Sequence, residues 1–149
     1  MYGIKVSLQS DIQSVFNAAA RLVAGFTKFE SVSAYIRNEL HWLRMPERVL
    51  FKLALLVRDS LADEVPGYLR ERLQQVSEVT YRSRLRSSDN GDLVIPKHRS
   101  SRFGKRRFSV SSAQIWNALP IDLKRFSGMD RRMFKKRLKN HLFNNPQRC

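Results

Sequence analysis

Apolar residues recur at helical spacing through most of the first 75 residues, and this spacing decides what the chain can fold into. Residues 11–25 predict an amphipathic helix that Gly25 ends. Its apolar face consists of Ile12, Val15, Phe16, Ala19, Leu22 and Val23. Shorter helices are predicted over 31–40 and 65–74, and Pro46 is a favourable first residue for a longer helix with a broad apolar face. We therefore expect four helices within residues 1–75.

The pattern changes near Thr80. Arg82, Arg84 and Arg86 alternate with other residues at the period of a strand, residues 89–92 have the composition of a turn, and residues 93–96 predict a returning strand. Helices are predicted again over 109–119 and after residues 127–130, which resemble a capping box. The expected fold is mainly α (α+β), with a helical bundle over residues 1–75. Residues 76–149 are expected to form a small β-hairpin at 82–96 followed by C-terminal helices. The two parts, 1–75 and 76–149, are expected to pack together as one fragment of a larger protein.

Trp116 lies in the predicted helix 109–119, beside Ile115 and Leu119. A large ring on an apolar helix face is a core anchor more often than a stacking platform. We expect Trp116 to be a core anchor that packs on the last helix. One side of that helix is predicted to carry Met133, Phe134, Leu138 and Leu142, and the other side Arg131, Arg132, Lys135, Lys136 and Lys139.

The formal net charge of +15 is concentrated in the second half of the chain. Residues 76–149 contain 18 Lys and Arg against 5 Asp and Glu, so this half carries +13 of the total. Such an excess favours a polyanionic partner, nucleic acid before an anionic membrane, because each neutralised phosphate releases counterions. The alternative interpretation is a solvated face whose charge serves solubility.

Two basic patches are the candidate contacts with RNA or DNA. The first consists of Arg82, Arg84, Arg86, Arg102, Lys105, Arg106 and Arg107, and the second of Lys135, Lys136 and Lys139. Basic side chains bind phosphates, while aromatic side chains offer stacking faces to unpaired bases. Phe108 is expected to anchor the loop to the core. For Phe103 the sequence leaves anchoring and base stacking equally open. No base-reading module is recognisable, so the predicted binding is not sequence-specific.

Motifs for catalysis are missing from the sequence. The three histidines lack metal-ligand spacing, Cys149 is the single cysteine, and neither phosphate-binding glycine motif occurs. Asp59, Asp63 and Glu64 are interpreted as a solvated face rather than as a metal site. We expect no enzymatic activity, no catalytic residue, no metal, no cofactor and no small-molecule substrate.

The sequence also predicts where the chain resides. No apolar run reaches the ~18 residues that cross a bilayer. The N-terminus lacks the apolar core of a signal peptide. An intracellular protein, nuclear or cytoplasmic, with no membrane contact is therefore expected.

Seven sequence blocks occur in an order that resembles a known family. They are YGI, QSVFNAAARLVAG, ELHWLRMPERVLFKLALLVRDSL, VPGYL, RSRLRSSDNGDLVIPK, FGKRRFSVSSAQIWNALPIDLKRF and FKKRLKNHLF. Together they resemble the C-terminal region of reverse transcriptases from non-LTR retrotransposons of the jockey-like lineages. The resemblance extends from Tyr2 to Phe143.

The resemblance implies that the chain follows the palm of an RNA-directed DNA polymerase that also carries an endonuclease. Residues 1–25 would belong to the thumb edge, and residues 30–149 to a segment that helps to hold template RNA and target DNA. The polymerase motif Tyr-x-Asp-Asp does not occur in this sequence. The resemblance therefore implies a non-catalytic fragment whose partners are nucleic acid and the remainder of the parent polymerase. The alternative is a relic or structural domain without binding activity.

Overall fold

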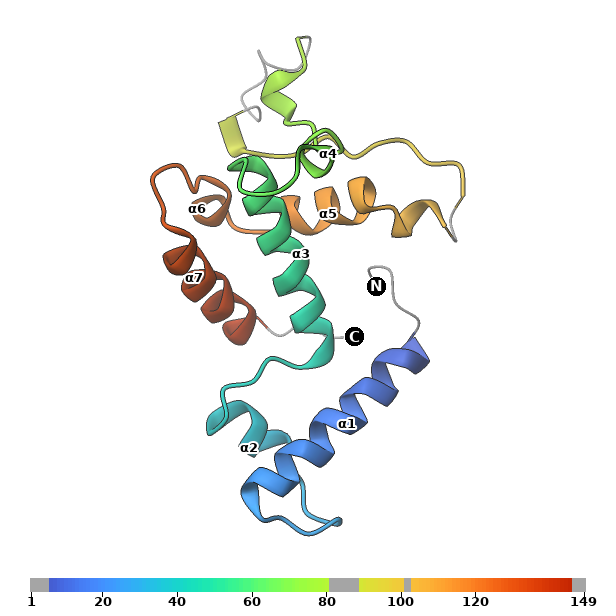
Figure 1. Cartoon of the computed structure of the whole chain (residues 1–149), viewed down its shortest axis with the longest axis vertical. Helices are drawn as coiled ribbons and strands as arrows, with labels where there is room; N and C mark the ends of the chain where they lie inside the picture. The colour runs from blue at the N-terminus through green and yellow to red at the C-terminus, as the bar shows by residue number, and fades with distance from the viewer. Residues whose placement is uncertain (1–5, 81–88, 101–102, 146–149) are drawn as a thin grey trace.

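The computed structural model describes residues 6–80, 89–100 and 103–145, and these residues are mainly α-helical, which confirms the predicted fold class (Figure 1). The described helices are α1 (Val6–Ala24), α2 (Ser33–Asn38), α3 (Met45–Leu61), α4 (Gly67–Arg70), α5 (Phe108–Asn117), α6 (Ile121–Lys124) and α7 (Arg131–Asn144). The short 3-10 turns η1 (Val76–Glu78) and η3 (Gly104–Arg106) lie between α4 and α5. None of these helices is long and apolar enough to cross a membrane.

The four predicted helices of the first 75 residues are present as α1 to α4. α1 ends at Gly25, whose φ of +70° lies in the left-handed region that glycine adopts without strain. α3 begins next to Pro46, and the Glu47 carboxylate accepts the backbone N–H of Arg44 at 2.9 Å. α4 is a single turn, shorter than the helix predicted over 65–74.

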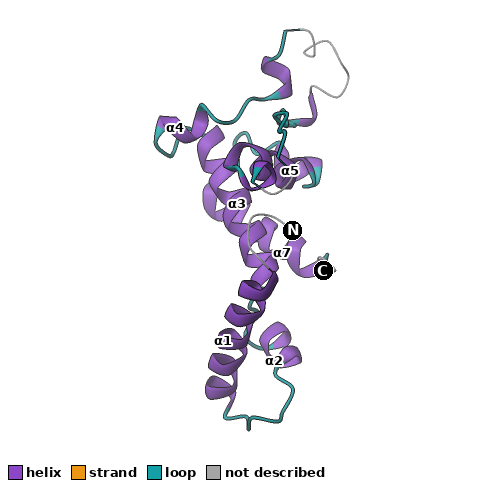
Figure 2. Cartoon of the chain, turned by 90° about the vertical axis from the view of Figure 1, so that its right-hand side faces the viewer, coloured by secondary structure: helices purple, strands orange, loops and turns teal. Residues whose placement is uncertain are grey.

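α3 is the central helix of the molecule. The main hydrophobic cluster joins Ala54, Leu55 and Val57 of α3 to the buried faces of α5, α6 and α7. A second, smaller cluster lies between α1 and α2. Figures 1 and 2 show the α1–α2 pair at one end of the long axis, with α3 leading from it into the main core. The predicted division at residue 75 therefore falls within one shared core.

The predicted β-hairpin at 82–96 is not confirmed. Residues 82–88 lie outside the described part of the chain. Leu93 forms an isolated antiparallel bridge with Gln75, which precedes the predicted first strand. The Asn117 side chain forms two hydrogen bonds with the Leu93 backbone: its Oδ1 accepts the Leu93 N–H at 2.8 Å, and its Nδ2 donates to the Leu93 carbonyl at 2.9 Å. These hydrogen bonds hold residues 92–94 against α5. Backbone hydrogen bonds from Val76 N–H to the Asp92 carbonyl and from Val94 N–H to the Gln74 carbonyl pair the same segment with residues 74–76.

Trp116 is fully buried, at 0% exposure, and joins three segments of the chain. Its indole Nε1 donates a 2.8 Å hydrogen bond to the carbonyl of Gly91. The ring stacks on Phe134 of α7, with centroids 6.2 Å apart, and meets the edge of Phe126 at 5.8 Å. Phe134, Leu138 and Leu142 are buried and form the apolar side of α7. Met133, assigned to that side from the sequence, is half-exposed instead.

A buried ion cluster corrects the interpretation of Asp59 as part of a solvated face. Asp59 is 5% exposed and accepts hydrogen bonds from Arg131 Nη2 at 2.8 Å and Nε at 3.0 Å. Arg58 lies beside it, with Nη1 3.3 Å from Asp59 and 2.5 Å from Glu64. Hydrogen bonding to Asp59 and its negative charge raise the pKa of Arg131. Arg131 therefore ties α7 to α3 rather than joining the cationic side of α7.

Replacing Trp116 tests its role as the core anchor. We expect Trp116→Ala to lower the free energy of unfolding by about 3 to 5 kcal/mol, because it leaves a cavity and an unpaired Gly91 carbonyl. Urea denaturation followed by circular dichroism measures the change. Tyr68→Ala, at a ring that is 64% exposed, is the control and should change stability by about 0.5 kcal/mol or less. Equal effects of the two substitutions would contradict the assignment.

Removing the Asp59 carboxylate tests the ion cluster. Asp59→Ala should destabilise the protein by about 2 to 4 kcal/mol, since Arg58 stays buried and keeps Glu64 as its remaining carboxylate partner. Asp122→Ala is the control, because Asp122 lies on the exposed first turn of α6 and forms no ion pair within the described residues. If Asp59→Ala unfolded at the same urea concentration as the control, the cluster would not hold α7 on α3.

Candidate nucleic-acid interface

A basic loop leads from Pro96 into α5. We use this name for the exposed side chains of Lys97, Arg99, Lys105, Arg106 and Arg107. None of these five side chains forms an ion pair with a carboxylate in the described residues. No Asp or Glu occurs in the sequence between Asp92 and Asp122. The positive charge of the loop is therefore not neutralised by nearby acids along the chain.

The remaining residues of the first predicted patch, Arg82, Arg84, Arg86 and Arg102, lie outside the described residues. Lys105, Arg106 and Arg107 lie together at η3, immediately before α5. Lys97 and Arg99, which belong to neither predicted patch, extend the same loop on its N-terminal side. A run of cations with no intervening acid is the sequence signal for all five.

The basic loop is held in shape by contacts within it. The Gly104 N–H donates to the Ser100 carbonyl at 3.0 Å, and the Phe103 N–H donates to Ser100 Oγ at 3.2 Å. Gly104 is buried against the His98 ring so closely that an added Cβ would lie 2.8 Å from two His98 atoms. The Arg107 carbonyl then accepts the first backbone hydrogen bonds of α5. These contacts fix where the loop enters the helix.

The two phenylalanines of this region differ in their surroundings. Phe103 is 69% exposed, so it does not anchor the loop and its ring faces solvent. Phe108 is half-buried and packs on the main hydrophobic cluster. Phe108 therefore anchors the start of α5, while Phe103 is accessible to a partner.

The second predicted patch lies on α7. Lys136 and Lys139 are exposed and Lys135 is half-buried, and Arg132 and Arg137 are also exposed on this helix. Figure 1 shows α7 on one side of α3 and the basic loop on the other. The fold thus separates the two predicted patches into different surfaces, which the sequence pattern did not reveal.

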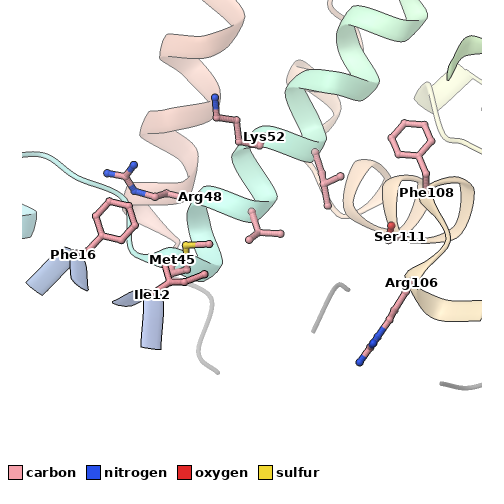
Figure 3. Close-up of a pocket in the computed structure, with 10 residues that line it drawn as sticks. Ile12, Phe16, Met45, Arg48, Lys52, Arg106, Phe108 and Ser111 are labelled. Atoms are coloured by element: carbon pink, nitrogen blue, oxygen red, sulfur yellow. The ribbon is translucent and has the colours of Figure 1, made fainter. Parts of the chain in front are cut away.

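A groove of about 690 Å³ opens between α1, α3 and α5 (Figure 3). Its walls are mainly apolar and come from Ile12, Phe16, Met45, Val49, Leu53 and Phe108, with Ser111 beside them. Arg48, Lys52 and Arg106 also line it. The Arg48 guanidinium lies 4.3 Å from the Phe16 ring centroid and donates to the Leu43 carbonyl at 2.9 Å. No local sequence signal marks this groove, because its walls are far apart along the chain.

The part of the chain that the structure describes contains no cluster of three His, Cys, Asp or Glu side chains that could hold a metal ion. Comparisons of the chain with protein-family models, with curated proteins and with solved structures find no match. The case for a nucleic-acid interface therefore rests on its own geometry and charge.

Substitution of Gly104 tests how the basic loop is held. Gly104→Ala should destabilise the protein by about 1 to 3 kcal/mol, because the new methyl group collides with Cβ and the ring of His98. His98→Ala removes that ring, so the double variant Gly104→Ala/His98→Ala should be destabilised by less than the sum of the two single effects. Urea denaturation of the wild type and the three variants gives the free energies of unfolding for this double-mutant cycle. Strict additivity would show that the ring of His98 does not limit the space at Gly104.

Proposed function

We propose that this chain binds RNA or DNA through backbone phosphates, without sequence specificity and without catalysis. The observation that carries the proposal is the basic loop, in which five exposed cations lack carboxylate partners within the described residues. Phosphate contacts of Lys and Arg require exposed charged ends and a surface free of competing acids. The basic loop meets both requirements, because its cations are exposed and the sequence has no Asp or Glu between Asp92 and Asp122.

The α7 face is a second contact surface in this proposal. Its cations lie on the side of the helix opposite the buried Phe134, Leu138 and Leu142. Since this face and the basic loop lie on different sides of α3 (Figure 1), one strand reaches both only by passing around the core. We therefore treat the loop as the primary site and the α7 face as an accessory site.

We further propose that the chain corresponds to the C-terminal, post-palm region of a non-LTR retrotransposon reverse transcriptase. The support is the order and spacing of the seven sequence blocks from Tyr2 to Phe143. The remainder of the parent polymerase is then a second partner, and polymerase activity belongs to that remainder. The competing hypothesis, a relic or structural domain, requires no binding to nucleic acid.

The test is fluorescence anisotropy with labelled single-stranded RNA, single-stranded DNA and duplex DNA, over salt from about 50 to about 300 mM. The loop variant is Lys105→Gln/Arg107→Gln, which leaves Arg106 intact. We expect it to weaken binding to every nucleic acid. On duplex DNA, the slope of log K against log salt should flatten by about 0.9 for each phosphate that the variant no longer neutralises.

Two matched double variants separate the surfaces. Lys136→Gln/Lys139→Gln tests the α7 face and should weaken binding less than the loop variant does. Lys28→Gln/Arg72→Gln removes the same charge from exposed positions outside both surfaces and should leave binding within about twofold of wild type. If all three variants bound as the wild type does, or if nothing bound at the lowest salt, the relic hypothesis would stand instead.

A further inference from the structure

We infer that the groove between α1, α3 and α5 receives an unpaired base of a single nucleic-acid strand, with the neighbouring phosphates on the cations at the groove. This inference rests on the proposed function and makes it more specific. A binding surface made of phosphate contacts alone holds duplex and single strands alike, whereas a groove for a base requires a base that is not paired.

The walls of the groove have the chemistry that an unstacked base requires. Phe16 of α1 and Phe108 of α5 lie on opposite sides of it, as Figure 3 shows. Aliphatic side chains of α3, among them Val49 and Leu53, form much of the surface between them. The volume of about 690 Å³ lies within the range of sites that enclose small organic ligands. The faces of a flat ring are removed from water when it enters this groove.

The positive charge of the residues that line the groove favours a negatively charged ligand. Arg48, Lys52 and Arg106 line it, and no carboxylate is among the lining residues. Lys52 and Arg106 are exposed and have no carboxylate partner within the described residues. Arg48 is held in place on the Phe16 ring. A flat ring with apolar faces and a negative charge beside it therefore complements the groove, and a nucleotide has both parts.

Continuity with the basic loop distinguishes a nucleic-acid strand from a single-headed amphiphile such as a fatty acid. Arg106 belongs to the loop and also lines the groove. Lys97, Arg99, Lys105 and Arg107 add positive charge along the same loop, far more than one head group would neutralise. The exposed Phe103 ring offers a further stacking face on this path. A nucleic-acid strand has a phosphate at every nucleotide, so it can contact all the cations of the basic loop in succession.

The test uses single strands of about 12 nucleotides with one 2-aminopurine, whose fluorescence rises when the base leaves its stacked neighbours. Wild-type protein should raise this fluorescence and should bind the single strand more tightly than duplex DNA of equal charge. Val49→Trp fills the groove and should abolish the rise and weaken single-strand binding by about 5- to 150-fold, while duplex binding stays unchanged. Lys52→Gln, at an exposed position, should weaken single-strand binding selectively without disturbing the fold.

Val23→Trp is the matched control, because it adds the same bulk to α1 at a side chain that is 61% exposed and outside the groove. Salt-dependent binding without a rise in 2-aminopurine fluorescence would overturn the groove assignment and leave the proposed function in place. Oleate binding that Val49→Trp abolishes, with no fluorescence rise from the strand, would overturn it in favour of an acyl chain. Failure to bind any oligonucleotide at low salt would overturn the proposed function and this inference together.

Discussion

The hydrogen bond from the Trp116 indole to the Gly91 carbonyl is the interaction on which the arrangement of the second half depends. It brings residues 89–93 against α5, and the same ring stacks on Phe134 of α7. The next residue of α5, Asn117, holds the Leu93 backbone through its side-chain amide. Because α5 is fixed in this way at its C-terminal end, the basic loop at its N-terminal end has a defined place on the core.

The sequence predicted those features whose signals are local. α1, α3, α5 and α7 each repeat apolar residues at helical spacing, and each lies where that spacing predicts a helix, although α1 begins five residues before the predicted start. Asp130 caps α7 by accepting the Arg132 N–H, as an acid before a helix does. The burial of Trp116 follows from the size of the ring and its apolar neighbours, which are visible without the fold.

What the sequence could not predict are pairings between distant residues. Asp59 and Arg131 are 72 positions apart, and each alone has the pattern of an ordinary surface charge. The bridge of Leu93 to Gln75 joins two residues between which no local signal in the sequence indicates a pairing. The cations of the basic loop and of α7 were predictable from composition. Their separation onto two sides of α3, and the groove beside Arg106, arise only when α1, α3 and α5 pack together.

The ion pairs of the described residues explain why so much positive charge remains on the surface. Asp59 and Glu64 are paired with Arg58 and Arg131, and Asp92 pairs with Lys124 at 2.7 Å. These carboxylates therefore serve to hold helices and loops together. The exposed cations of the basic loop and of the α7 face, which have no carboxylate partner within the described residues, repel one another, and this repulsion opposes the compact state. A polyanion that binds the folded chain removes this repulsion and stabilises the fold by mass action, so binding and folding stability are thermodynamically linked.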